Sequence, residues 1–319
     1  MSDDSESILA AIIRSVIIGE KVASNEWPNE FGDLKFWGLV DGSDGIEAPI
    51  GIDWLKDEKI REALTPLATT WLKYLEVEAC VNSTNDRLLG KVDLGSCGGY
   101  VCIAEVQTKG RGRRGRKWHT PLGGNLAISL GLEIKRDLAE LSGLSLVIGL
   151  SVLDAIESFG VEGLSVKWPN DLMMEGKKLG GILIELANTT GSEHVSTALI
   201  GIGVNLSLNE RVTNVIEQQV TDLSQNELLV DRNKLVGKIL SSLVEYIDVF
   251  EAKGFKPFRE QYNLHHILND RYCQIELGSR KVSGRVIGID SHGEIELDTN
   301  SGPLIFGAGE VSLRPLPID

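Results

Sequence analysis

The spacing of apolar residues divides this chain of 319 residues into segments that predict helices and strands. Apolar residues recur at intervals of three and four, as on one face of a helix, in residues 8–18, 54–64, 138–159 and 231–262. The last of these helical segments is expected to break near Gly254. Short runs rich in apolar and β-branched residues, which favour strands, occupy residues 77–81, 101–107, 125–132, 164–168, 179–186 and 196–204.

The two ends of the chain differ from this central part. Toward the C-terminus, turn sequences at 278–279, 291–293 and 300–302 separate short strand segments, which are residues 272–277, 282–289, 294–297 and 304–306. This alternation is typical of a small β-barrel. At the N-terminus, residues 1–60 hold 13 acidic and 5 basic residues, a net charge of −8. We therefore expect an N-terminal segment over 1–64, a central domain over 65–268 and a C-terminal domain over 269–319.

Composition and charge exclude several classes of protein. With 42% hydrophobic and 24% charged residues, the chain has the composition of a soluble globular protein, and no apolar run is long enough to span a membrane. The N-terminus is acidic, unlike a secretory signal; the four cysteines form no CxxC pair, and the five histidines lack metal-ligand spacing. We expect a cytoplasmic protein with reduced thiols and no metal site of its own. The net charge of −14 argues against general nucleic-acid binding.

Residues 109–117, hereafter the basic loop, point to an anionic ligand. Six of these nine residues are Lys or Arg and the other three are Gly, within an acidic protein. Glycines let backbone N–H groups approach a ligand closely, and arginine side chains form paired hydrogen bonds with carboxylate or phosphate. The alternatives are a solvated basic loop and a nucleic-acid patch.

Other segments carry groups suited to such a ligand. Residues 83–85 (STN) open a helix and either bind a small polar group or only cap the helix. Residues 167–172 (KWPNDL) present an amide and a carboxylate after a strand, either for a nucleotide and its Mg²⁺ or as a turn cap. Residues 177–185 (KKLGGILIE) and 201–206 (GIGVNL) place a lysine and an asparagine beside glycines, which either expose backbone to a ligand or allow close strand packing.

Taken together and in this order, five motifs closely resemble those of biotin protein ligases, the biotin–[carboxylase carrier protein] ligase family. The motifs are STN at 83–85, GRGRRGRKW at 110–118, KWPNDL at 167–172, KLGGIL at 178–183 and GVNL at 203–206. The resemblance covers about residues 75–315. It implies an α/β (α+β) fold: a central mixed-sheet catalytic domain of the biotin/lipoate-ligase type, a C-terminal SH3-like β-barrel, and a small N-terminal helical or winged-helix-like segment.

The resemblance implies an ATP-dependent ligase that works in two steps. The biotin carboxylate attacks the α-phosphorus of ATP, which gives biotinyl-5′-AMP and pyrophosphate. A specific lysine of a biotin carboxyl carrier protein then attacks this mixed anhydride and releases AMP. Both steps bring anions together, so cationic groups must stabilise the charge. ATP, biotin and ATP-bound Mg²⁺ are the implied small molecules, and the chemistry needs no covalent enzyme intermediate.

The resemblance also implies roles for individual residues. Lys178, Arg113 and Arg116 are the expected catalytic residues, with Lys178 between the biotin carboxylate and the α-phosphate. The implied biotin-binding set is Ser83, Thr84, Asn85, Gln107, Arg111, Gly112, Arg113, Lys178 and Gly181. The implied ATP-binding set is Arg116, Trp118, Asn170, Asp171 and Asn205, with Asp171 near the metal or the acceptor lysine.

Two other functions compete with this one. Lipoate ligases share the catalytic fold but generally lack the GRGRRG run. Bifunctional members of the family also repress a biotin operon through a winged helix, whose end residues 34–40 faintly resemble; residues 24–33, however, contain three acidic and no basic residues, which argues against DNA binding. Residues 220–223 (VTDL) lack the tryptophan that some relatives place over adenine. The sequence leaves a homodimer and the identity of the acceptor open.

Overall fold

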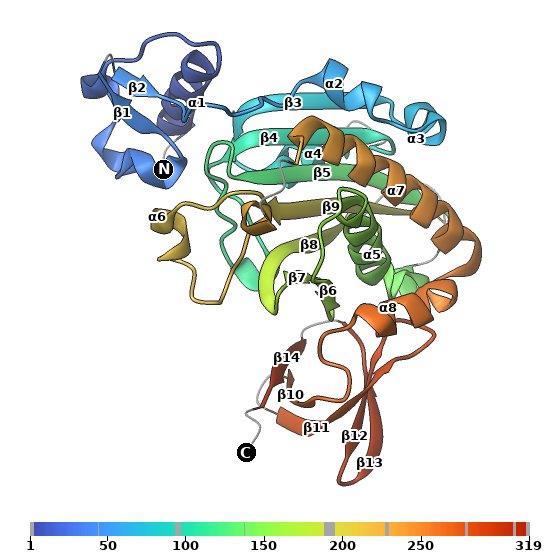
Figure 1. The fold of residues 1–319 in the computed structure, drawn as a ribbon. Helices are drawn as coiled ribbons and strands as arrows, with labels where there is room; N and C mark the ends of the chain where they lie inside the picture. The colour runs from blue at the N-terminus through green and yellow to red at the C-terminus, as the bar shows by residue number, and fades with distance from the viewer. Residues whose placement is uncertain are drawn as a thin grey trace.

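The protein has three parts, arranged around one large β-sheet (Figure 1). The computed structural model describes residues 3–43, 45–92, 97–136, 138–187, 195–226, 230–277, 280–308 and 311–316. The turn predicted at 278–279 lies outside these residues. Among the helices of the described residues, none is long and apolar enough to cross a membrane.

The N-terminal unit, residues 3–43 and 45–52, packs against the edge of the central sheet. It consists of α1 (Asp3–Ile17), three 3₁₀ helices (Ser24–Glu26, Asn29–Phe31 and Leu34–Trp37) and the hairpin of β1 (Val40–Gly42) and β2 (Gly45–Glu47). Its core includes Leu9, Ile13 and Ile46, which share one buried cluster with Cys80 and Val106 of the central sheet. The unit is therefore joined to the sheet by a common apolar core.

The central sheet has seven strands in the order β3-β4-β5-β9-β8-β7-β6. These are β3 (Tyr74–Val81), β4 (Tyr100–Gln107), β5 (Asn125–Ile134), β6 (Leu164–Lys167), β7 (Asp171–Met174), β8 (Lys177–Ala187) and β9 (Ser196–Asn205). β3 and β4 run parallel and all other neighbours antiparallel, so the expected mixed sheet is confirmed. β7 was not predicted from the sequence.

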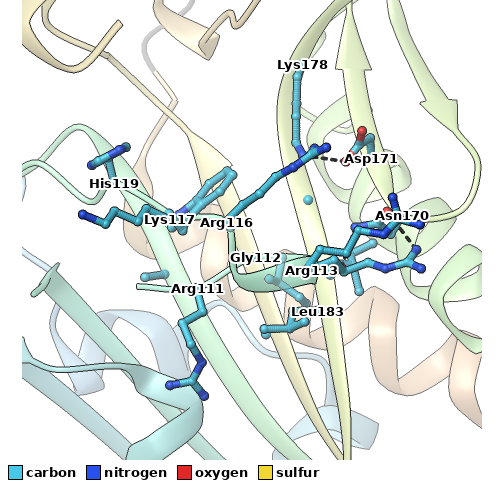
Figure 2. Close-up of a pocket in the computed structure, with 18 of the residues that line it drawn as sticks. Arg111, Gly112, Arg113, Arg116, Lys117, His119, Asn170, Asp171, Lys178 and Leu183 are labelled. Carbon is cyan, nitrogen blue, oxygen red and sulfur yellow. Dashed lines mark hydrogen bonds and ion pairs between the residues drawn. The ribbon is translucent and has the colours of Figure 1, made fainter. Parts of the chain in front are cut away.

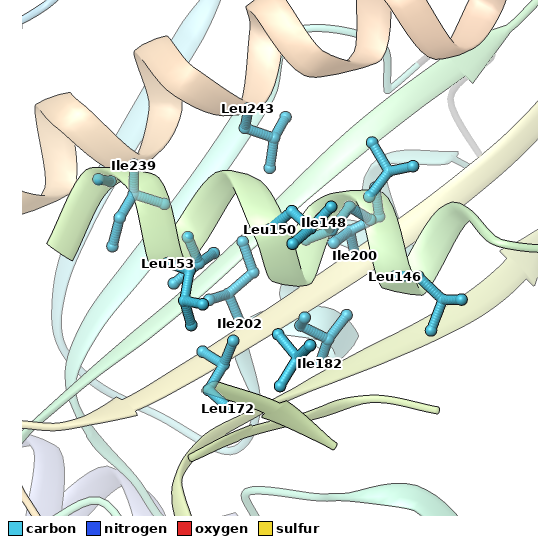
Figure 3. Packing of buried hydrophobic residues seen from close by; sticks show 14 of the residues in the cluster. Leu146, Ile148, Leu150, Leu153, Leu172, Ile182, Ile200, Ile202, Ile239 and Leu243 are labelled. Carbon is cyan, nitrogen blue, oxygen red and sulfur yellow. The ribbon is translucent and has the colours of Figure 1, made fainter. Parts of the chain in front are cut away.

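Helices cover both faces of this sheet. α5 (Leu144–Glu157) lies on one face, and α7 (Arg232–Lys253) packs against α5 on that face (Figure 3). Figure 3 shows Leu150 of α5 between Leu243 of α7 and Ile200 of β9, and all three are buried. α4 (Thr84–Val92) belongs to the opposite face, because its Leu88 packs with residues of β4 and β9 that alternate with those facing α5.

The helix predicted over 138–159 is wrong in its first turns. The structure has a 3₁₀ helix at Leu138–Leu141, and α5 begins only after Gly143, whose φ is +85°. A Cβ at Gly143 would lie 2.8 Å from Cβ of Phe255, so this close contact requires glycine. The left-handed conformation of Gly143 separates the 3₁₀ helix from α5.

Of the other predicted helices, one is shorter than expected and one is divided. Residues 54–64 contain α2 (Asp57–Glu62), which α3 (Pro66–Trp71) follows, and both pack against α7. The break predicted near Gly254 is confirmed: α7 ends there, and a 3₁₀ helix (Lys256–Phe258) and α8 (Arg259–His265) follow.

The C-terminal domain is a five-stranded antiparallel sheet in the order β13-β12-β11-β10-β14. Its strands are β10 (Tyr272–Leu277), β11 (Arg280–Ile289), β12 (Ile295–Thr299), β13 (Gly302–Phe306) and β14 (Val311–Pro315). The last of these was not predicted from the sequence. The Trp168 indole N–H donates to the Gly293 carbonyl over 3.1 Å, which fixes this domain to the KWPNDL segment.

A buried histidine lies where α8 joins the two domains. His266 is 4% exposed, its Nδ1 lies 2.9 Å from Asn269 Oδ1, and its Nε2 has no hydrogen-bond partner among the described residues. Burial lowers its pKa from 6.5 to about 4, since the charged ring would lose its hydration. As the pH falls, His266 therefore binds a proton at a higher pH in the unfolded chain than in the folded chain. This contribution to stability is complete above pH 6.5 and is lost as the pH falls toward 4.

We expect His266→Gln to flatten the pH dependence of folding stability. In the wild type, the free energy of unfolding should fall by as much as about 3 kcal/mol through His266 between pH 6.5 and 4. Urea denaturation at several pH values in this range measures the slope. His292→Gln is the matched control, because His292 is largely exposed. Equal slopes in the wild type and His266→Gln would contradict this account.

Candidate functional site

One cavity of about 660 Å³ brings together thirteen of the fourteen residues predicted to bind ligands (Figure 2). They come from the ends of β3 and β4, the basic loop, the KWPNDL turn and β8. The fourteenth, Asn205, does not line the cavity. It is buried at the end of β9, where its amide donates to the Thr221 carbonyl and accepts from Asn125.

The parallel pairing of β3 and β4 explains why segments distant in sequence meet here. Val81 is in register with Gln107, so the residues that follow β3 lie beside the end of β4. Gln107 Oε1 accepts from both the backbone N–H and the hydroxyl of Thr84, at 2.9 and 3.2 Å. The pocket formed by Ser83, Thr84, Asn85 and Gln107, hereafter the polar pocket, is almost fully buried. Such a pocket suits a small, neutral, polar group.

Ser129 of β5 completes the polar pocket, and it was not predicted from the sequence. Its hydroxyl lies 2.6 Å from Thr84 Oγ1 and 2.5 Å from Asn85 Oδ1. The residue is fully buried and lines the cavity. A lone serine within the apolar run of residues 126–132 is the signal that could have identified it.

The basic loop is held in a compact shape by its own backbone. Gly112 N–H donates to the Arg116 carbonyl at 2.8 Å, and Trp118 N–H donates to the Gly110 carbonyl at 2.9 Å. Arg114 adopts a left-handed conformation, with φ of +59°, within the 3₁₀ turn Arg113–Gly115. These bonds fold six positive residues into a short segment beside the cavity.

Arg113 connects the loop to two other parts of the protein. Its Nη1 donates to Asn170 Oδ1 over 3.2 Å, and its Nη2 donates to the carbonyl of Ala308 in the C-terminal domain over 2.6 Å. Burial and the neighbouring Arg114 charge lower the pKa of Arg113. An anionic ligand would offset the cost of placing this charge in a partly buried position.

Lys178 and Asp171 form an ion pair inside the cavity. Lys178 Nζ lies 2.6 Å from Asp171 Oδ1, and the two side chains are 14% and 21% exposed. The residues stand on adjacent strands, since Asp171 of β7 is in register with Gly181 of β8. The carboxylate therefore fixes the ammonium group of Lys178 over the floor of the cavity.

Trp118 occupies space that glycine leaves free. A Cβ at Gly203 of β9 would lie 2.4 Å from the Trp118 ring, so only glycine allows the indole to lie against the sheet there. The indole N–H is buried and has no acceptor among the described residues, although Trp118 lines the cavity. It is a donor available to a ligand.

The charges around the cavity favour an anion. Eight basic residues line it, against two acidic ones; the basic residues are Arg111, Arg113, Arg114, Arg116, Lys117, Lys167, Lys178 and Arg314, and the acidic ones are Asp171 and Glu217. In a chain with a net charge of −14, this concentration of cations is local to the site. Phosphate and carboxylate groups match it in charge and in hydrogen bonding.

The N-terminal unit holds the basic loop at both ends. At the first residue of the loop, Lys109 Nζ lies 2.5 Å from a carboxylate oxygen of Glu6 in α1. After the loop, the Phe36 ring packs edge-on against His119 with centroids 5.3 Å apart, and Leu122 N–H donates to the Trp37 carbonyl over 2.8 Å.

Comparisons with known proteins agree with this arrangement. Residues 77–205 match the Biotin/lipoate A/B protein ligase family, and residues 270–314 match the Biotin protein ligase C terminal domain. The bifunctional ligase/repressor BirA of Salmonella typhimurium is 35% identical over 286 residues, which cover 88% of this chain and 86% of that protein. The chain belongs to the biotin protein ligase family.

The chain also matches other biotin protein ligases over nearly the whole length of those proteins. A biotin–[acetyl-CoA-carboxylase] ligase from Mycobacterium tuberculosis is 29% identical over 264 residues, which cover 81% of this chain and 95% of that protein. A solved structure, the biotin protein ligase from Aquifex aeolicus in complex with biotin and ATP, matches with a TM-score of 0.65 and 30% identity. The match covers 77% of this chain and 100% of that one.

Arg111 takes a different direction from Arg113 and Arg116 in this ligase. Its Nη1 lies 2.6 Å from Asp86 Oδ2, and its Nη2 lies 3.4 Å from both carboxylate oxygens of Glu185. Figure 2 shows its side chain turned away from Lys178 and Asp171. The hydrogen bond to Asp86 raises the pKa of Arg111, with a further contribution from Glu185. The sequence indicated Arg111 as a ligand residue but not these two partners.

The cysteines of the ligase are unsuited to nucleophilic catalysis. All four are buried free thiols. Burial raises their pKa to about 12 at Cys80 and Cys102, and to about 11 at Cys97 and Cys273. The thiolate, which is the reactive form, is therefore scarce at neutral pH. Within the described ranges, no group of three or more His, Cys, Asp or Glu side chains could hold a metal ion.

Proposed function

We propose that this ligase joins biotin to a specific lysine of a biotin carboxyl carrier protein at the expense of ATP. The observation that carries the proposal is one cavity that combines the buried polar pocket with a lining of eight basic residues. Biotin has both matching features, a neutral ureido head group and a carboxylate, and ATP adds the phosphates. The named relatives and the biotin- and ATP-bound structure support the same pairing of substrates.

In the first step, a carboxylate oxygen of biotin attacks the α-phosphorus of ATP, and the bond to pyrophosphate breaks. The polar pocket holds the head group, and Lys178 lies between the carboxylate and the α-phosphate. Asp171 keeps the Lys178 ammonium in place through their 2.6 Å ion pair. Arg113 and Arg116 stabilise the negative charge that develops on the phosphate oxygens. Trp118 and Asn170 face the nucleotide.

The position of Asn205 implies an indirect role in this step. Its side chain is buried and hydrogen-bonded to Thr221 and Asn125. Asn125 in turn donates to the His119 carbonyl at the end of the loop, over 3.1 Å. We propose that Asn205 holds Asn125, and through it the His119 backbone, in position on the nucleotide side of the cavity.

Mg²⁺ enters this scheme as the companion of ATP. The carboxylate of Asp171 and the amide of Asn170 line the cavity where a nucleotide-bound ion would lie. Mg²⁺ commonly binds through one or two carboxylates together with substrate phosphates, so these residues fit that group. The ion would neutralise phosphate charge during adenylation.

In the second step, the ε-amine of the acceptor lysine attacks the carbonyl carbon of biotinyl-5′-AMP, and AMP leaves. The buried thiols of this chain take no part, because the lysine reacts directly with the mixed anhydride. The protein would act in the cytoplasm, where buried thiols stay reduced.

A labelling assay tests the proposed function. The protein, ATP, Mg²⁺ and biotin are incubated with a biotin-carboxyl-carrier domain, and streptavidin detects the product. Lipoate in place of biotin is the control that separates this activity from lipoate ligation, and because streptavidin does not bind lipoate, the mass of the carrier domain detects that transfer. Transfer of biotin but not of lipoate supports the proposal. Absence of biotin transfer, or preferential transfer of lipoate, contradicts it.

We expect the protein not to bind DNA at physiological salt. Affinity for duplex DNA needs several clustered Lys or Arg residues that release counterions. Residues 1–60 offer five scattered ones, of which Arg14 and Lys59 are ion-paired with Glu78 and Asp53. A mobility-shift titration of the adenylate-bound protein on the DNA upstream of its own biotin genes measures this.

The control in this titration is a known repressor on its own operator under the same conditions. Salt-sensitive binding below micromolar concentration would restore the repressor as a second function. A flat titration would leave the N-terminal unit with a structural role.

A further inference from the structure

Glu185 is a charged side chain on β8 that the mechanism above does not use. It is half-exposed, and it contacts both the polar pocket, at Asn85, and the basic loop, at Arg111. On the pocket side, Asn85 Nδ2 donates to Glu185 Oε2 over 2.7 Å. On the loop side, Arg111 Nη2 lies 3.4 Å from both Glu185 oxygens. One carboxylate therefore joins two residues that are 26 positions apart in the sequence.

The contact with Asn85 fixes the amide that faces the ligand. Asn85 is 4% exposed, its Oδ1 accepts from the Ser129 hydroxyl at 2.5 Å, and its Nδ2 donates to Glu185. The amide cannot turn over without losing both bonds, one of which is charge-assisted. A second N–H and a second lone pair remain for a polar head group.

The contact with Arg111 fixes the loop from the other side. Arg111 lies between Glu185 and Asp86, which stands on α4. Neither carboxylate lines the cavity, and the two hold the first arginine of the basic loop against β8 and α4. The rest of the loop follows, because Arg111 and Lys117 form a backbone bridge.

We propose that Glu185 is a positioning residue that couples occupancy of the polar pocket to closure of the basic loop. The inference rests on the proposed function, with the ureido group of biotin as the occupant. A head group bound to Asn85 holds the amide, the amide holds the Glu185 carboxylate, and the carboxylate holds Arg111. Coupling of this kind is reciprocal, so a closed loop must also raise the affinity of the pocket.

The chain supplies a matched control for this relay. Exposed ion pairs contribute little on their own, so loss of any Arg111 partner could loosen the loop slightly. Asp86 is the closer partner of Arg111, at 2.6 Å, but only Glu185 also bonds to Asn85. Asp86→Asn weakens the loop contact and leaves the pocket contact intact. Glu185→Gln removes the charge shared with Arg111 and keeps an acceptor for Asn85.

The experiment measures hydrogen exchange of peptides that span residues 109–119, with and without saturating biotin, in the full-length protein. We expect biotin to slow exchange in the wild type and in Asp86→Asn by the same factor, although exchange in Asp86→Asn is faster throughout. In Glu185→Gln, exchange should be almost equally fast with and without biotin, a factor close to one. By reciprocity, the Kd for biotin in calorimetry should rise by about fivefold or more in this variant.

Several outcomes overturn the relay. One is that biotin slows exchange in Glu185→Gln as much as in the wild type. Another is that the effect of biotin on exchange is lost equally in Asp86→Asn. Glu185→Gln should also add nothing once Arg111→Gln has disconnected the loop, and additive effects in the double variant would contradict the proposal. A wild-type protein that binds no biotin would overturn the proposed function as well, whereas binding with an unchanged factor in Glu185→Gln overturns only this inference.

Discussion

Lys178→Ala is expected to abolish adenylate formation while the protein stays folded. Lys178 is the ammonium group held over the cavity floor by Asp171, at 2.6 Å. Removal of one charge-stabilising donor from a preorganised site slows the chemical step by about 100- to 1,000-fold. Biotin-dependent exchange between pyrophosphate and ATP measures the first step without any acceptor protein.

Lys177→Ala is the matched control, because Lys177 precedes Lys178 on the same strand and is exposed. It removes an equal charge from β8 and should exchange pyrophosphate at the wild-type rate. Lys178→Arg should recover part of the activity, since it restores the charge but not the position of the ammonium. Exchange near the wild-type rate in Lys178→Ala would remove Lys178 from the mechanism.

Arg113→Gly is expected to weaken retention of biotinyl-5′-AMP more than its synthesis. Arg113 bridges the basic loop to Asn170 and to the Ala308 carbonyl of the C-terminal domain. A hydrogen bond from a charged group contributes about 1.5–3 kcal/mol, so loss of this side chain should speed release of the adenylate about tenfold or more. The freed mixed anhydride then acylates lysines of bystander proteins. Streptavidin blots of serum albumin added to the reaction measure this leakage.

Arg114→Gly provides the comparison for the loop charge. Arg114 has a φ of +59°, a conformation that glycine adopts without strain, so this variant removes one charge and keeps the loop geometry. Albumin labelling should stay close to wild type in Arg114→Gly and rise in Arg113→Gly. Equal labelling by both variants would show that the total charge of the loop, and not the bridge made by Arg113, retains the adenylate.

The apolar pattern predicted the strands that carry most of the core and missed those that depend on distant contacts. Residues 101–107 and 196–204 are strongly apolar, and both are buried central strands. β7, by contrast, begins at Asp171 inside a motif typical of a turn, and it is a strand because β6 and β8 flank it. The long helix predicted at 138–159 is broken by contact of Gly143 with Phe255, which no local pattern reveals.

The motifs predicted which residues gather at the site but not how their side chains are directed. The resemblance of the motifs to those of biotin protein ligases placed Lys178, Asp171 and Arg113 in one site, and all three line the same cavity in the structure. The orientation of Arg111 depends on Asp86 of α4 and Glu185 of β8, to which the sequence assigned no role. The same limit applies to Ser129, because a strand pattern gives the face of a residue and not its partners.

The contacts of the N-terminal unit set a limit on how far this ligase can be shortened. The family match begins at residue 77, yet Glu6 and Trp37 bind the two ends of the basic loop from outside that region. A gene fragment cut at the domain boundary would encode every residue that lines the cavity and would leave both stems of the loop without their supports. We therefore expect a minimal labelling enzyme engineered from this chain to need the N-terminal unit together with the catalytic domain.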